Sequence, residues 1–118
     1  MKDPLLNVEG IYCASINAGI KNNDDLDLSV ISLTKGSVTA AVFTQNIFCA
    51  APVLVAKNHL QNFPRALLIN SGNANAGTGK EGIVNTLRSC EVLANELDIK
   101  AEEVLPFSTG VIGKQIDL

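Results

Sequence analysis

Aromatic residues and strongly charged stretches are what this sequence has least of. It has no tryptophan and one tyrosine, and aromatic residues make up 4% of the chain while hydrophobic residues make up 47%. We therefore predict a globular protein with a core of aliphatic side chains. The net charge of -3 arises from nine basic and twelve acidic residues, and no basic run occurs. This distribution offers no surface to a line of phosphates and excludes nucleic acid as a partner.

Long apolar runs and clustered cysteines are missing as well. The longest apolar stretch is far shorter than the roughly twenty residues of a membrane helix, which excludes a membrane span. The start of the chain, MKDPLLNVEG, places Asp and Pro next to its only Lys, unlike a secretory signal. Cys13, Cys49 and Cys90 form no C-x-x-C pair and lie far from His59, so we predict no metal site. We interpret the cysteines as small buried residues of a cytoplasmic protein.

The first part of the chain has the alternation of half-buried strands. Apolar and polar residues alternate over residues 11–16 and 26–33, and the run VTAAVFT follows after Lys35-Gly36-Ser37. This spacing predicts a hairpin in which a third strand covers residues 38–43.

Helices and strands alternate in the second part. Ala51-Pro52 begins a predicted helix, with Pro where the first turn tolerates it. Thr78 and Glu81 have the spacing of a capping box before a helix that the apolar spacing extends to about Leu97. Short strands are predicted at residues 65–69 and 102–107, and the whole pattern predicts one mixed α/β domain that continues beyond these 118 residues.

Two short motifs resemble ligand-binding loops and fail on their details. GTGKEG satisfies G-x-G-x-x-G, but six residues separate its first Gly from the preceding strand, too many for a dinucleotide site. Thr78 stands where a phosphate-binding P-loop needs Lys. Asp24, Asp25 and Asp27 lack the Gly and trailing Glu of a calcium loop, so a solvated turn is favoured there.

Two features leave both a structural and a functional interpretation open, and a third, His59, is interpreted as structural. NSGNANAG predicts a tight, hydrogen-bonded connection from strand to helix, or amides that support a nearby active site. His59, near a helix end, is interpreted as structural. LPFSTGVIG predicts a turn at Ser108-Thr109-Gly110. Its Thr109 hydroxyl and Gly110 N–H either cap the turn or donate to an oxyanion, and a hydroxyl there could also be a nucleophile, although no general base is near in sequence.

Several stretches together resemble one known family. GIKNNDDLDLSVI, AAVFTQNIFCAAPVLVAKNHL, LLINSGNANAGTGKEG and LPFSTGVIG occur in the order and spacing of the ornithine acetyltransferases, the bifunctional glutamate N-acetyltransferases of arginine biosynthesis. The resemblance covers nearly the whole chain from about Gly10. It implies an α/β (α+β) sandwich of the ornithine acetyltransferase and DmpA-like type, with a mixed sheet and helices. It also implies that residues 1–118 are a truncated, single-domain N-terminal portion of the family's α chain.

The resemblance also implies a reaction. Members cut themselves before a Thr, which becomes the nucleophile at the start of a β chain and carries the acetyl group from N-acetyl-ornithine to glutamate. Some members also accept acetyl-coenzyme A, and no resident cofactor or metal is implied. The family's oxyanion stabilisers match Thr109 and Gly110. No Thr here follows an Ala, so the family's Ala-Thr cleavage site and its nucleophile are expected outside these residues.

The resemblance further implies a partner and leaves alternatives. The expected partner is the β chain of the same precursor in an α2β2-type heterotetramer, and this chain alone is expected to be inactive. The alternatives are a hydrolase or aminopeptidase of the same fold, and a non-catalytic relative that keeps only the fold.

Overall fold

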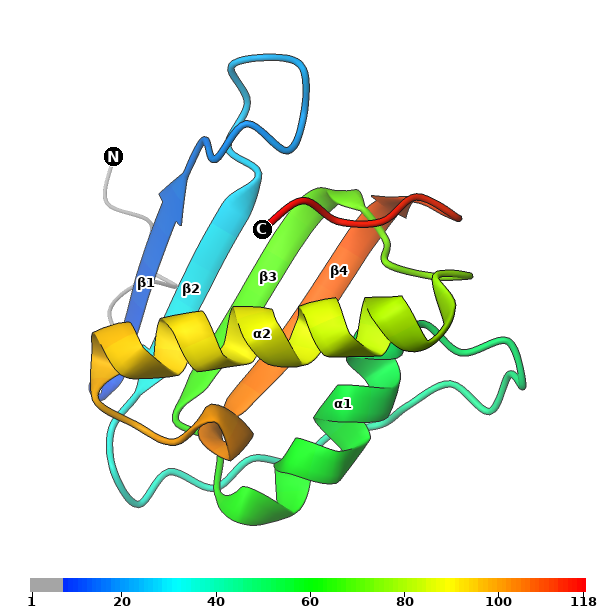
Figure 1. Cartoon of the computed structure of the whole chain (residues 1–118). Coiled ribbons are helices and arrows are strands. Elements are labelled where there is room, and N and C mark those ends of the chain that lie inside the picture. Colours follow the sequence, from blue (N-terminus) through cyan, green and yellow to red (C-terminus); the bar gives the residue numbers. More distant parts are fainter. Residues whose placement is uncertain (1–7) are drawn as a thin grey trace.

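A mixed four-stranded sheet forms the centre of the protein. The structure, a computed structural model, describes residues 8–118. The strands are β1 (Ile11–Ile16), β2 (Leu28–Leu33), β3 (Ala66–Asn73) and β4 (Val104–Val111), and they lie in the order β1-β2-β3-β4 (Figure 1). The pairs β1–β2 and β2–β3 are antiparallel, while β3 and β4 are parallel and joined through a helix. The predicted α/β architecture is confirmed, and the start of the chain, where we predict no secretory signal, lies mostly outside the described residues.

Two helices pack on this sheet. Helix α2 (Gly79–Leu97) crosses one face, and α1 (Ala51–His59), extended by the short helix η2 (Leu60–Asn62), packs against β4 and α2 (Figure 1). The short helix η3 (Ala101–Glu103) leads into β4. Neither α1 nor α2 is long and apolar enough to cross a membrane. The core is made of small aliphatic residues and one cysteine, as the composition predicts, and comprises Val55, Ala66, Cys90, Ala94 and Val104.

The two faces of the sheet have different surroundings. Leu68 and Asn70 of β3 face α2 and line a cavity beneath it, together with Val30 of β2. Because successive side chains of a strand point to opposite faces, Leu67 and Ile69 project from the other face. No helix of the described residues covers that face (Figure 1), and both side chains are only half-buried.

The predicted third strand at residues 38–43 is wrong. The turn at Lys35-Gly36 does form, with the Ser37 N–H donating to the Thr34 carbonyl at 3.2 Å. The segment after it joins no sheet, because β2 already has β1 on one side and β3 on the other. A hairpin partner of β2 would have to displace one of them. Apolar side chains of this segment are therefore left in the open, with Val42 99% and Ile47 101% exposed.

Two local predictions near the C-terminal ends of β3 and β4 are also wrong. Ser108-Thr109-Gly110 is not a turn, since it belongs to β4 and pairs with residues 70–72 of β3. The capping box of α2 does not form, because the Thr78 hydroxyl donates to the Asn75 side-chain oxygen at 2.7 Å instead of capping the helix. Both errors have one cause. Asn and Gly residues of NSGNANAG supply partners that a reading of local spacing does not include.

Single-residue predictions had mixed outcomes. Cys90 is buried as predicted and Cys49 is half-buried, but Cys13 is exposed because β1 is exposed along its length. Asp27 is not part of a solvated turn, since it is only 3% exposed. His59 is structural, as we interpret it from the sequence: it is buried, and its Nδ1 donates to the Val104 carbonyl at 2.8 Å. Because a carbonyl only accepts, Nδ1 carries the proton.

Candidate functional site

Gly110 lies where the backbone of β3 leaves no room for a side chain on β4. It pairs with Gly72 of β3 and has a φ of 131°, in the region that favours glycine. A Cβ on Gly110 would lie 2.3 Å from the Gly72 carbonyl carbon and 2.6 Å from the Asn73 nitrogen. Both neighbours are backbone atoms that cannot move aside without shifting β3. The position therefore requires glycine for space as well as for conformation.

The alternation of peptide groups along β4 directs the Gly110 N–H away from β3. It points to the edge of β4 that pairs with no strand of the described residues, which we call the free edge. The Glu103 carbonyl accepts the Arg65 N–H at 2.7 Å, so odd-numbered residues of β4 direct their peptide groups to the β3 side. Even-numbered residues direct theirs outward. The outward Val104 carbonyl accepts from His59, and Pro106, which has no N–H, also belongs to the outward set. The same alternation carries the N–H of Gly110 to the open edge.

Thr109 completes this exposed end of β4. Its neighbour Ser108 faces the cavity under α2, so the Thr109 side chain projects from the opposite face of the sheet. Thr109 and Gly110 are both exposed. A hydroxyl and an outward N–H on consecutive residues are thus accessible to a molecule that approaches this end of the sheet. Two such donors are what stabilises an oxyanion.

The described residues give this end no nucleophile with a base. The hydroxyl of Ser108 donates to the side-chain oxygen of Asn70, which is an amide and not a base. His59 is held by Val104, and burial together with the nearby Glu91 raises the pKa of the Cys90 thiol to about 12. No group of three His, Cys, Asp or Glu side chains suited to a metal ion occurs within residues 8–118. This end of β4 thus presents two hydrogen-bond donors, and the described residues place no nucleophile with a base beside them.

The asparagines of NSGNANAG form the hydrogen-bonded connection that the sequence predicts. Asn75, 1% exposed and with a φ of 46°, donates from Nδ2 to the Gly82 carbonyl at 3.0 Å and to the Thr86 hydroxyl at 2.7 Å. Asn73 donates from Nδ2 to the carbonyls of Lys114 and Gln115, each at 3.1 Å. The network ties the start of α2 and the segment after β4 to the end of β3.

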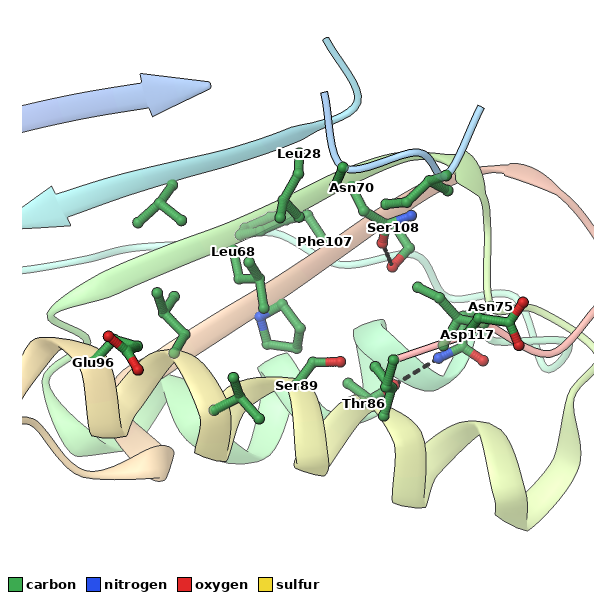
Figure 2. A pocket seen from close by; sticks show the side chains of 18 residues that line it. Leu28, Leu68, Asn70, Asn75, Thr86, Ser89, Glu96, Phe107, Ser108 and Asp117 are labelled. Atoms are coloured by element: carbon green, nitrogen blue, oxygen red, sulfur yellow. Dashed lines mark hydrogen bonds between the residues drawn. The ribbon is translucent and has the colours of Figure 1, made fainter. Parts of the chain in front are cut away.

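A cavity of about 390 Å³ lies between α2 and the sheet (Figure 2). Its walls are mostly aliphatic, and Glu96 lies at one end, while most of its polar side chains lie toward the other (Figure 2). There, Figure 2 shows the hydrogen bonds Ser108–Asn70 and Asn75–Thr86. This polar end is the one next to Thr109 and Gly110 in β4.

The loop between β1 and β2 is a part of the site region that sequence reasoning missed. Asp27 accepts the backbone N–H groups of Ala18 at 2.7 Å and Lys21 at 2.9 Å. These hydrogen bonds lower the pKa of the Asp27 carboxyl below its ordinary value of 3.8, and the one from Lys21 has the larger effect on the pKa. The carboxylate thereby holds the loop beside Gly72, whose Cβ would meet Ile20 and Lys21 at 3.0 Å. The available signal was a carboxylate immediately before strand β2, which we interpret from the sequence only as part of an acidic cluster.

Comparisons with known proteins identify relatives of this chain. The model of the ArgJ family matches residues 12–118. An arginine biosynthesis bifunctional protein ArgJ from Methylococcus capsulatus is 50% identical over 114 residues, which are 97% of this chain and 28% of that protein. The ArgJ protein of Neisseria meningitidis serogroup A is 47% identical over 112 residues, 93% of this chain and 28% of its own length. The chain thus spans a little more than a quarter of the curated relatives it matches.

Solved structures are similar over the same region. The crystal structure of ArgJ from Bacillus halodurans has a TM-score of 0.87 at 34% identity, and the match covers 92% of this chain and 57% of that one. The ornithine acetyltransferase of Mycobacterium tuberculosis, solved in complex with ornithine, has a TM-score of 0.89 at 36% identity, covering 95% and 62%. With a family model that matches nearly every described residue, and relatives of the same name and fold, the chain belongs to the ArgJ family.

Proposed function

We propose that this chain supplies the oxyanion hole of an acetyltransferase that moves an acetyl group from N-acetyl-ornithine to glutamate. The family match supports the reaction, and the relative from M. tuberculosis is an ornithine acetyltransferase that binds ornithine. The observation that carries the assignment to Thr109 and Gly110 is the outward N–H of Gly110 at the free edge of β4, next to an exposed hydroxyl.

The chemistry needs these donors twice, once in each half of the transfer. A Thr hydroxyl of the complete protein gives its proton to the Thr α-amino group, and its oxygen attacks the acetyl carbon of N-acetyl-ornithine. The carbonyl oxygen becomes negatively charged and accepts hydrogen bonds from Thr109 and the Gly110 N–H. The C–N bond then breaks and ornithine leaves with the proton, which leaves an acetyl ester. The neutral amine of glutamate then attacks the ester carbon through a second oxyanion at the same donors. The C–O bond to Thr breaks, and the amine proton passes through the Thr α-amino group to the Thr oxygen, which restores the hydroxyl.

The nucleophile in this proposal lies outside residues 1–118. Within the described residues no hydroxyl near Gly110 has a base, and the chain corresponds to about 28% of its curated relatives. The solved relatives have shorter chains, of which it covers 57% and 62%. Chains well below the full length are expected where a precursor is cut. We infer that residues 1–118 belong to the N-terminal portion of such an α chain, in a cytoplasmic α2β2-type assembly with the β chain.

The decisive variant is Thr109→Ala in the complete enzyme. Loss of one preorganised oxyanion donor typically lowers kcat by about 10²–10³-fold, and KM should change little because the donor acts in the transition state. Thr34→Ala is the matched control, since Thr34 follows β2 at the opposite end of the sheet. An unchanged kcat for Thr109→Ala would remove Thr109 from the role.

A mass spectrum of the purified native protein tests the wider proposal. Under denaturing conditions we expect a second chain that begins with Thr and gains one acetyl group when N-acetyl-ornithine is added. Acetyl-glutamate should then form when glutamate follows. Release of free acetate in place of acetyl-glutamate would instead identify a hydrolase of the same fold.

A further inference from the structure

Asn70 and Ser108 form a polar bridge immediately before the two proposed oxyanion donors. They are direct neighbours across the parallel pair β3–β4, and Asn70 is 6% exposed. The Ser108 hydroxyl donates to the Asn70 Oδ1, while the Asn70 Nδ2 donates to the Asn73 carbonyl at 2.8 Å. Because a carbonyl accepts only, Nδ2 must face Asn73, and Oδ1 is then left for Ser108. The amide orientation is therefore fixed by two partners.

The bridge surrounds the close approach of the two glycines. Through Ser108 it holds the residue before Thr109, and through Asn73 it holds the residue after Gly72. The Val111 carbonyl accepts the Ala74 N–H at 2.9 Å on the far side. Gly72 and Gly110 thus lie between two fixed points on each strand. A shift of β4 along β3 would break the side-chain bridge as well as the backbone ladder.

The surroundings do not require polar residues at these positions. The same face of the sheet carries Leu28, Val30, Leu68 and Pro106 around the cavity. An apolar pair would suit these walls and would avoid the cost of removing an amide and a hydroxyl from water. The polar pair lies at the same end of the cavity as Asn75 and Thr86 (Figure 2), and Ser108 directly precedes Thr109 and Gly110 in β4.

We propose that Asn70 and Ser108 are positioning residues that hold the Thr109–Gly110 peptide so that its N–H meets the oxyanion. This inference rests on the proposed acetyl transfer. Neither side chain needs to touch the substrate, since both act through the backbone of β4. The Asn70–Ser108 bridge fixes the direction of the Gly110 N–H, while Gly72 and Gly110 allow the two backbones to lie close together.

The test is Ser108→Ala in the complete enzyme. We expect kcat to fall about tenfold, the typical effect of one neutral hydrogen bond, with KM unchanged. Rates are divided by the number of acetylated chains counted by mass spectrometry, so that unfolded protein does not contribute. Ser108→Thr keeps the hydroxyl and should restore kcat to within about threefold of the wild type.

The matched control is Ser89→Ala. Ser89 lines the same cavity, but its hydroxyl donates to the Asn85 carbonyl within α2 at 2.9 Å. Its kcat should equal that of the wild type, although the cavity changes by the same atom. If Ser108→Ala does not fold, Ser108→Cys replaces it, because the thiol is a weaker donor and should give an intermediate kcat.

The outcomes separate the two proposals. An active wild type with unchanged kcat in Ser108→Ala would overturn the positioning role alone. The same would follow if Ser89→Ala lost as much, or if Ser108→Thr gave no rescue. A wild type that transfers no acetyl group to glutamate would overturn the proposed function, and the positioning role with it.

Discussion

Gly110 combines two constraints that each favour glycine, a φ of 131° and backbone atoms of β3 within 2.6 Å of any added Cβ. Gly36 shares only the first. Its φ is 92°, and nothing lies within 4 Å of an added Cβ. The two positions therefore separate the cost of conformation from the cost of a backbone collision.

Gly110→Ala should be far more damaging than Gly36→Ala. At Gly36 the variant meets only an unfavourable φ, which costs about 1–2 kcal/mol of unfolding free energy. At Gly110 the strands must also part, which moves the N–H of the proposed site. We expect kcat of the complete enzyme to fall at least as far as after loss of a donor, about 10²–10³-fold, while Gly36→Ala keeps its kcat. Urea unfolding and steady-state kinetics measure the two effects, and equal kinetics would show that the close approach is not needed for activity.

Asn75 shows at the same scale how one side chain can replace a regular motif. It occupies the left-handed region without being glycine, as asparagine does more readily than most residues. Its Oδ1 accepts a hydrogen bond from the Thr78 hydroxyl, which is therefore not used to cap α2. Gly82 then has no room for a side chain, since an added Cβ would lie 2.6 Å from that Oδ1. The Thr78 hydroxyl that the capping-box spacing identified does form a hydrogen bond, but with Asn75 and not with the backbone of α2.

Among the elements, the loop of residues 17–26 depends most clearly on a single charge. The Asp27 carboxylate accepts backbone N–H groups from the loop, and its own backbone pairs with Ile16 and Ser71. The hydrogen bonds favour the charged form, which is why its pKa is lowered. A carboxyl whose pKa is lower in the folded state stabilises the fold above its unfolded pKa, and the contribution disappears as the pH falls through the folded pKa.

Asp27→Asn should therefore remove part of the acid sensitivity of the protein. At pH 7 the variant is expected to be less stable than the wild type, and the difference should shrink as the pH falls below 3.8 and through the lowered pKa of Asp27, where the wild-type carboxyl becomes protonated. Urea unfolding midpoints between pH 2 and pH 7 measure this. The control is Asp24→Asn on the exposed side of the loop, which should leave the pH profile as it is. A constant difference between wild type and Asp27→Asn at every pH would mean that the hydrogen bonds matter but the charge does not.

Sequence reasoning recovers elements best where their signal is local. The apolar spacing from Ile83 to Leu97 predicts α2, and alternation predicts β1 and β2, because periodicity follows from the element's own geometry. The segment 38–43 has the same strand composition but lacks a partner, since both edges of β2 are taken. The composition of a segment does not indicate whether a neighbouring strand has an edge left for it to pair with.

The site was predictable in its residues but not in its setting. Thr109 and Gly110 follow from the resemblance, yet their place inside β4, opposite Ser71 and Gly72, depends on long-range pairing. The Asn70–Ser108 bridge joins residues 38 positions apart. Neither residue type signals such a pair from spacing alone, because the two strands of a parallel pair are joined by a long crossover, here through α2, and local spacing does not fix their register.

At the scale of the whole molecule, one face of the sheet carries no helix of the described residues, although Leu105 on that face is buried (Figure 1). The helices lie on one side, and Ile31, Leu67 and Ile69 point to the other without a charged residue among them. Domains bury such a face against a second layer. In the proposed assembly we expect the β chain to provide that layer, and the exposed side chains Val42 and Ile47 are a second surface available to it.

Ile69→Lys in the complete protein tests this arrangement. A lysine at the centre of a packed sheet face must lose its water without an opposite charge nearby, which costs several kcal/mol per ion. We expect the variant chain to separate from the second chain in native mass spectrometry under conditions that keep the wild type assembled. Val84→Lys is the control, because Val84 is 62% exposed on α2 and its lysine stays in water. If Ile69→Lys remained assembled like Val84→Lys, the second layer would have to lie elsewhere, and the exposed segment at residues 38–48 would be the next surface to alter.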